Sequence, residues 1–151
     1  MKPLFVLLIT SLIALFVFRA LGNGYDFPRA ARVGMAVMLM FTALGHVLYT
    51  EGMAMMIPAQ IPYKKELVYF TGLVEVLGAI GLLFPQYRTL TAWLLILFFL
   101  LMVPANIKAA VEGLNYQTGT FDGPGLRYLW FRVPLQALFI GWVYLSAIRF
   151  A

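Results

Sequence analysis

Residues 66–111 of the chain read ELVYFTGLVEVLGAIGLLFPQYRTLTAWLLILFFLLMVPANIKAAV, and this stretch decides the fold. It contains two apolar runs, 66–84 and 89–111, each about as long as the ~20 residues that a helix needs to cross a hydrocarbon core about 30 Å thick. Pro85 ends the first run, and only residues 85–88 separate the two. A connection this short joins antiparallel neighbours. The stretch therefore predicts a hairpin of two transmembrane helices.

Three more apolar runs flank this hairpin, at residues 3–21, 30–50 and 129–148. The chain is 63% hydrophobic and 11% charged, with a mean hydropathy of +0.90. A water-soluble domain carries about 25% charged residues because its surface is hydrated, so these apolar residues belong in lipid. We predict an all-α fold: one integral membrane domain, residues 1–151, with five transmembrane helices in a bundle.

The first run has a competing interpretation as a cleaved signal peptide. Its apolar segment, residues 4–18, is at the upper limit of length for a signal core, and no small-residue cleavage site follows Arg19. We therefore interpret residues 3–21 as a retained transmembrane helix.

The connections between the runs differ in character. Residues 22–29 are rich in Gly, Asn, Asp and Pro, which predicts a turn. Residues 51–65 hold three methionines and two prolines. This segment is too apolar for a free loop and too short and broken to span, so we expect it to be interfacial or re-entrant. Residues 112–128 are polar and rich in glycine, which predicts an exposed loop.

Composition excludes several classes of site. The chain has no cysteine, which removes disulfides, thiolate metal sites and cysteine nucleophiles. Its single histidine, His46, rules out a bis-histidine haem within the chain, and we expect it to hold neither haem nor a metal. The net charge is +5, but the eleven Lys and Arg are scattered near predicted helix ends. We therefore expect a lipid bilayer and no nucleic acid as partner.

The basic residues are nearly balanced between the two sides of the predicted bundle. Arg29, Arg88 and Arg149 fall on one side. The other side carries Lys64, Lys65, Lys108, Arg127 and Arg132. We assign the first side, which holds the two shortest connections and the C-terminal tail, to the cytoplasm by the positive-inside rule. The chain is then a multi-pass protein of the cell membrane (the inner membrane in a bacterium), with its N-terminus outside and its C-terminus cytoplasmic.

Five polar residues lie inside the predicted spans, where such residues are costly and mark functional sites: His46, Glu75, Asn106, Arg132 and Gln136. Glu75 is near mid-membrane, because the nine residues from Glu66 correspond to about 13 Å of helix. The direction of the chain puts the other four in the same half of the bilayer. We therefore expect one polar pocket that opens toward the connections 51–65 and 112–128.

Roles within this pocket follow from residue type. The residues on the same helical face as Glu75 are small: Thr71, Gly72, Gly78 and Ala79. Because small residues let membrane helices approach closely, we expect Glu75 to point into the bundle. We expect Glu75 and His46 to be catalytic groups that transfer protons, with Arg132 as the ion-pair partner of Glu75. Asn106, Arg132 and Gln136 would bind a ligand. Structural alternatives stay open: a Glu75–Arg132 clasp, a His46 bond to a loop carbonyl, hydrogen bonds of Asn106 and Gln136 between helices, and Arg132 reaching lipid headgroups.

Several motifs resemble the DoxX-like family of small polytopic membrane proteins, over about residues 33–146. They are Gly45-His46, Met56-Ile57-Pro58, Ile61-Pro62, the segment 67–78 followed by Gly81-Leu82-Leu83 and Pro85, Pro104-Ala105-Asn106-Ile107, and Arg132-Val133-Pro134-Leu135-Gln136. The resemblance implies a four-helix core made by the second to fifth runs, with residues 3–21 as an additional helix. Tyr69, inside the 67–78 motif, joins the expected ligand-binding residues.

The family takes its name from a subunit associated with a quinol-oxidising enzyme. The resemblance therefore implies a redox-associated subunit that acts on or beside a quinone-like lipophile, with a quinone as the expected cofactor. Any other electron carrier must come from a partner in a membrane complex. Two alternatives stay open: non-redox binding or transport of a lipid or sterol-like ligand, and a structural or assembly subunit, including a homo-oligomer. Function argued from family likeness alone leaves open whether the chain is an enzyme.

Overall fold

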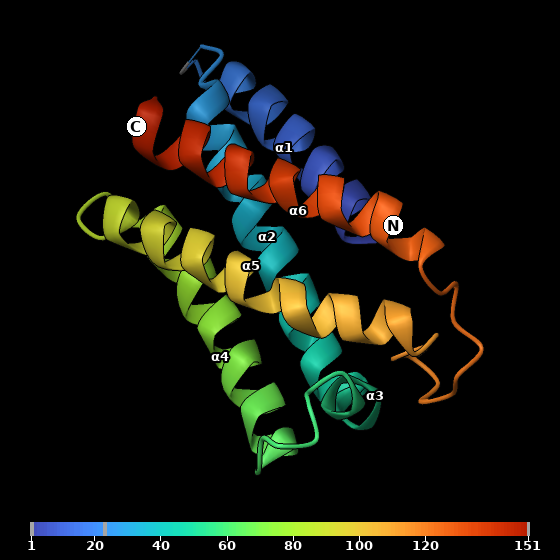
Figure 1. The fold of residues 1–151 in the computed structure, drawn as a ribbon. Helices are drawn as coiled ribbons and strands as arrows, with labels where there is room; N and C mark the ends of the chain where they lie inside the picture. The colour runs from blue at the N-terminus through green and yellow to red at the C-terminus, as the bar shows by residue number, and fades with distance from the viewer. Residues whose placement is uncertain (1, 23, 151) are drawn as a thin grey trace.

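The computed structural model describes residues 2–22 and 24–150, which form six α-helices and one short π-helix (Figure 1). The elements are α1 Lys2–Ala20, α2 Phe27–Leu48, α3 Thr50–Met55, α4 Lys64–Leu83, α5 Arg88–Val111, α6 Arg127–Tyr144 and η1 Leu145–Arg149. Five are long and apolar enough to cross a membrane: α1, α2, α4, α5, and α6 continued by η1. The predicted all-α fold with five spans is confirmed.

Local chemistry sets the ends of the helices. Asp26 caps α2, because its Oδ1 accepts a hydrogen bond from the backbone N–H of Arg29 at 2.9 Å. Pro28 lies in the first turn, where its missing N–H costs nothing. These two residues start α2 at Phe27, three residues before the expected position 30. Helix α4 ends at Leu83, just ahead of Pro85, which cannot continue it.

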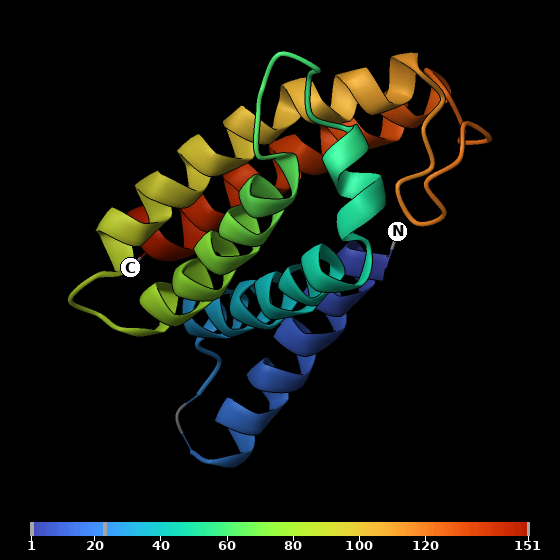
Figure 2. The same ribbon diagram turned by 90° about the horizontal axis from the view of Figure 1, so that it is seen from below.

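Helix α2 occupies the middle of the bundle (Figure 1 and Figure 2). It packs against α1 and α4, while α5 packs against α4 and α6, and η1 returns to α2. The core is filled by side chains that are almost completely buried, among them Met35 and Leu39 of α2, Leu82 of α4, Leu95 of α5 and Phe139 of α6. Since lipid is as apolar as these side chains, their close packing rather than their removal from water stabilises the bundle.

Helix α1 lies at the edge of the bundle and packs chiefly against α2 (Figure 2). The two helices approach closely at Ser11 and Gly34, where a Cβ added to the glycine would lie 1.9 Å from the Ser11 hydroxyl oxygen. Leu7, one turn before Ser11, is fully buried in this contact. Most of the other large side chains of α1 are exposed. Small residues at a helix crossing are typical of membrane proteins.

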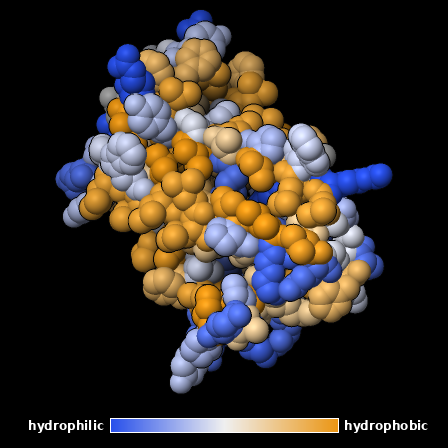
Figure 3. Space-filling model, viewed as in Figure 1, coloured by the Kyte–Doolittle hydropathy of each residue, from blue (hydrophilic) through white to orange (hydrophobic). Residues whose placement is uncertain are grey.

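The outer surface of the bundle is apolar. Large hydrophobic side chains are exposed on every spanning helix, for instance Leu12, Leu44, Leu77, Leu94 and Leu138. On the face in Figure 3, hydrophobic residues cover the middle of the bundle, and hydrophilic residues gather mainly toward its two ends. A water-soluble monomer rarely exposes an apolar surface this continuous. The chain is a multi-pass membrane protein in contact with the lipid bilayer.

The connection 112–128 folds back onto α3 rather than standing free. The carbonyl of Tyr116 lies against Gly52, where an added Cβ would be only 1.8 Å away from it. Leu114 is 5% exposed, and the Nζ of Lys108 donates a hydrogen bond to the carbonyl of Met55 at 2.7 Å. A bridge between Asn115 and Thr120 closes the loop on itself. The loop and α3 therefore form one cover over this end of the bundle.

Burial of Tyr116 in this cover has a consequence for stability at high pH. Burial raises the pKa of the Tyr116 phenol above its ordinary value, and the neighbouring Tyr128 adds to the rise. The folded chain therefore keeps this proton to a higher pH than the unfolded chain does. The stabilisation is complete below the ordinary pKa of about 10 and is lost as the pH rises through the folded-state pKa.

We expect the Tyr116→Phe variant to lose less stability than the parent chain between about pH 9 and pH 11, because only the parent carries this titrating group. The measurement is the free energy of unfolding by denaturing detergent at each of the two pH values. Tyr63→Phe is the matched control, since Tyr63 is 76% exposed, and it should behave like the parent. Equal losses in Tyr116→Phe and the parent would show that the buried phenol does not titrate as described.

Candidate functional site

A histidine and a carboxylate face each other inside the bundle. His46 comes from the last turns of α2 and Glu75 from the middle of α4. The Nε2 of His46 lies 3.4 Å from the Oε2 of Glu75, and their side chains are 12% and 10% exposed. The expected ion pair between Glu75 and Arg132 is wrong, because Glu75 meets α2 rather than α6.

The other side of the His46 ring is fixed by α4. Its Nδ1 lies 2.9 Å from the carbonyl oxygen of Val68 and 3.1 Å from the hydroxyl oxygen of Thr71. A carbonyl only accepts hydrogen bonds, so Nδ1 carries a proton and donates it. The Thr71 hydroxyl in turn donates to the same Val68 carbonyl at 2.9 Å, which leaves its lone pairs for Nδ1. The imidazole is therefore held in one orientation and one tautomer.

This arrangement leaves Nε2 as the nitrogen that exchanges a proton. With Nδ1 protonated, favourable contact between Nε2 and the carboxyl group of Glu75 needs one proton between them. The pair is then either an imidazolium beside a carboxylate or a neutral imidazole beside a carboxylic acid, and both forms have zero net charge. Moving the proton between them leaves the net charge of the pair at zero, so no unpaired charge is created in the apolar surroundings.

Gly72 of α4 makes the approach of the two helices possible. A Cβ at position 72 would lie 2.9 Å from the Cβ of His46, closer than real Cβ contacts come. The neighbouring Thr71 carries the hydroxyl that contacts Nδ1. The sequence Thr71-Gly72, one turn before Glu75, thus supplies both the space for His46 and part of its hydrogen bonding.

A second polar group lies between α5 and α6. The Nε of Arg132 donates to the Oδ1 of Asn106 at 3.2 Å, and the Nδ2 of Asn106 donates to the carbonyl of Met102 at 2.8 Å. Gln136 donates through Nε2 to the carbonyl of Phe99. Pro104 has no N–H to donate to the carbonyl of Leu100, four residues earlier in α5. Gln136 bonds to the neighbouring carbonyl of Phe99.

A cleft of about 10 Å³ lies beside this second group, lined in part by Asn106, Arg132 and Gln136. That volume is enough for about one water molecule. Asn106 and Gln136 are each at least 93% buried, whereas Arg132 is partly exposed. The group therefore combines two fixed amide side chains with a guanidinium that reaches the rim of the cleft.

The structure brings the predicted residues together in two groups rather than in one pocket. His46 and Glu75 belong to the α2–α4 interface, and Asn106, Arg132 and Gln136 to the α5–α6 interface. Depth along each helix was predicted from the sequence, but the rotation of each helix about its axis was not.

Tyr69, the remaining candidate, lies on the outer face of α4 and is 52% exposed. Two groups around His46 were missed by sequence reasoning: the Thr71 hydroxyl and the Val68 carbonyl. Thr71 was recognised only as a small neighbour of Glu75. The carbonyl gives no signal in a sequence, because every residue has one.

Comparison with known proteins places the chain in a family. The model of the family described as Domain of unknown function (DUF8561) matches residues 35–147. The chain belongs to this family. The DUF8561 region runs from Met35 in α2 to Ala147 in η1, so it contains all six candidate residues and leaves α1 outside. No curated protein and no solved structure matches the chain. The DUF8561 family is described without an activity, so the DoxX-like resemblance stays a prediction.

Proposed function

We propose that this chain binds a quinone-like lipophile within the membrane and exchanges a proton with it through the His46–Glu75 pair. The pair itself carries the proposal: an imidazole and a carboxyl group, almost buried, face each other at 3.4 Å between two spanning helices. Ionisable side chains in such positions are costly, and they mark proton relays and substrate pathways.

The chemistry of a quinone fits such a pair. A quinone becomes a quinol by taking up two electrons and two protons, and one of these protons would pass through Nε2 of His46 and the carboxyl group of Glu75. The second proton would come from water, and the electrons from a redox enzyme in the same membrane. The anchored Nδ1 supports this role, because a ring that cannot turn presents its exchangeable nitrogen in one direction.

Two further observations support the proposal. The resemblance to DoxX-like proteins implies a redox-associated subunit with a quinone-like ligand. The α5–α6 group adds hydrogen-bond donors. Among the described residues, Arg132 donates only from Nε, to Asn106, so its other N–H groups can serve a carbonyl or a headgroup. With the N-terminus outside, as the basic residues favour, both groups lie toward the outer half of the membrane.

The test measures the binding of decylubiquinone to the full chain in detergent. Binding is monitored through the quenching of tryptophan fluorescence. Glu75→Gln keeps the shape of the side chain but cannot hold a negative charge. We expect it to weaken binding about tenfold, the effect of losing about 1.4 kcal/mol from one charge-assisted hydrogen bond. Glu66→Gln is the matched control, because it is the same substitution at an exposed position in the first turn of the same helix.

Equal binding by Glu75→Gln and Glu66→Gln, or no binding by the parent chain, rejects the proposal. Mass spectrometry of lipids extracted from the purified chain separates the classes of ligand, since a retained sterol-like molecule or other lipid favours binding or transport without redox chemistry.

One observation favours a competing function, a structural clasp. His46 fits against Gly72 at the crossing of α2 and α4, so the pair also fixes how these helices meet. A clasp predicts that Glu75→Gln and His46→Ala change the stability or yield of the protein and leave the binding of decylubiquinone unchanged.

A further inference from the structure

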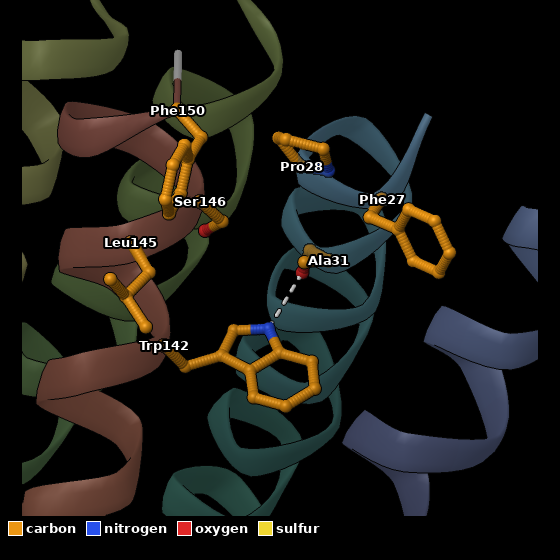
Figure 4. A pocket seen from close by; sticks show the side chains of 7 residues that line it. All are labelled: Phe27, Pro28, Ala31, Trp142, Leu145, Ser146 and Phe150. Carbon is orange, nitrogen blue, oxygen red and sulfur yellow. Dashed lines mark hydrogen bonds between the residues drawn. The ribbon is translucent and has the colours of Figure 1, made fainter. Parts of the chain in front are cut away.

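A pocket of about 220 Å³ lies at the other end of the bundle, between the start of α2 and η1 (Figure 4). Its walls are mostly apolar, with Phe27 and Pro28 on α2 and Trp142, Leu145 and Phe150 on the opposite side. Trp142 donates from Nε1 to the carbonyl of Ala31 at 3.0 Å, which fixes the indole across the gap. Phe27, Leu145 and Phe150 are half exposed or more, so the pocket opens to the outside of the bundle.

The π-helical turn η1 gives this pocket unusual polar chemistry. The N–H of Phe150 bonds to the carbonyl of Leu145 at 3.0 Å, whereas in an α-helix it would bond to the carbonyl of Ser146. The Ser146 carbonyl is thereby released and accepts a hydrogen bond from the guanidinium of Arg32 on α2. The π-turn thus fastens η1 to α2 and holds the guanidinium of Arg32 against Ser146, which lines the pocket.

Ser146 also lines the pocket, and its hydroxyl has no hydrogen-bond partner among the described residues. The residue is 5% exposed, and its Oγ makes no hydrogen bond within the described part of the chain. Figure 4 shows this side chain on η1, turned toward the space between η1 and α2. A buried polar group without a partner destabilises the protein, because it has lost its bonds to water. A ligand that supplies a hydrogen bond here would remove that destabilisation.

The surroundings are strongly cationic. Arg32 lies within electrostatic range of Arg88 at the start of α5 and of Arg29 on α2. The Nε of Arg88 is buried and also makes no hydrogen bond within residues 2–22 and 24–150. Asp26 is the one acidic side chain described at this end, and it is engaged in capping α2. This end of the bundle therefore has several guanidinium donors and an excess of positive charge. Both features favour an anionic ligand with several acceptor oxygens.

We propose that this pocket binds an anionic phospholipid of the adjacent leaflet. The phosphate lies at the cluster of Arg32 and Arg88 and accepts from the Ser146 hydroxyl, and one acyl chain covers the apolar wall made by Trp142 and Leu145. Charge complementarity and the unpartnered hydroxyl identify the headgroup, and the membrane-spanning fold puts the open, apolar mouth of the pocket in lipid. Anionic lipids are concentrated in the cytoplasmic leaflet, so the expected cytoplasmic side for these arginines agrees with this ligand.

The test is native mass spectrometry of the full chain in detergent, titrated with phosphatidylglycerol or phosphatidylcholine of identical acyl chains. We expect phosphatidylglycerol to be retained about tenfold more strongly, because only its headgroup carries a net negative charge for the arginines. Arg88→Gln is expected to lower this preference by about fivefold, since it removes one charge-assisted donor. Lys64→Gln, which removes a positive charge at the opposite end, should leave the preference unchanged.

Ser146→Ala keeps the test decisive if Arg88→Gln does not fold. It removes only a hydroxyl that has no partner in the described structure, so folding is retained and the retention of phosphatidylglycerol falls about threefold. Three results overturn the proposal: equal retention of the two lipids by the parent chain, unchanged retention of phosphatidylglycerol in Ser146→Ala, or displacement of the bound lipid by ~10 mM inorganic phosphate, which would indicate a site for a free anion.

Discussion

Replacing Glu75 by leucine is expected to lower the free energy of unfolding by about 2 kcal/mol, because a buried polar group loses its partner. The Nε2 of His46 then faces an apolar side chain, and the bond from Nδ1 to Val68 prevents the ring from turning toward another acceptor. His46→Leu leaves the carboxyl group of Glu75 without a partner and should lower the free energy of unfolding by a comparable amount. The double variant leaves neither group unpaired. We therefore expect its loss of free energy of unfolding to be smaller, by at least about 1 kcal/mol, than the sum of the two single losses.

The measurement is a double-mutant cycle, with the full chain unfolded by SDS from mixed micelles. Glu66→Leu controls for the loss of a carboxylate from α4, and because Glu66 is exposed its effect should stay within about 0.5 kcal/mol. Single effects that simply add would show that His46 and Glu75 do not interact across α2 and α4. Coupling together with loss of decylubiquinone binding in Glu75→Gln identifies a functional pair, and coupling without that loss identifies a clasp.

The spans are predictable from the sequence, but the partners of each helix are not. Crossing a bilayer imposes a length and a composition on a helix, and both are visible in the sequence. Lipid-facing and core-facing positions, however, use the same residue types. Leu94, Leu95 and Leu97 of α5 are 56%, 2% and 53% exposed, although all three are leucines. The small residues around Glu75 correctly point it inward, yet they do not distinguish α2 from α6 as the helix that it meets.

The candidate site is also hard to predict because its side chains form hydrogen bonds to backbone carbonyls, which leave little trace in the sequence. Pro104 marks the carbonyl of Leu100 as one that loses its helical donor, yet Gln136 bonds to the neighbouring carbonyl of Phe99. The bond from His46 to Val68 lacks even a proline as a marker, because α4 contains none. The π-turn at Ser146 likewise leaves no pattern in the residues 145–149, whose types suit an α-helix equally well.

Gly52→Ala is expected to destabilise the cover of α3 and the loop 112–128 by about 3 kcal/mol, at the upper end of the usual cost of overpacking. The added Cβ would lie 1.8 Å from the Tyr116 carbonyl oxygen, and because real contacts of this kind essentially never fall below 3.0 Å, the backbone must move. Neither atom belongs to the end of a flexible side chain. The loop therefore has to lift from α3 as a unit.

The pKa of Tyr116 should report this movement of the loop independently of any measurement of stability. Its pKa is raised by burial in the cover, so lifting the loop should return the pKa toward the ordinary value, which an ultraviolet titration of tyrosinate detects. Gly141→Ala is the matched control, because a Cβ there meets nothing within 4 Å. That variant should gain about 0.5–1 kcal/mol from helix propensity and leave the titration unchanged. An unchanged titration in Gly52→Ala would mean that α3 yields instead of the loop, and that the contact between Gly52 and Tyr116 does not hold the cover in place.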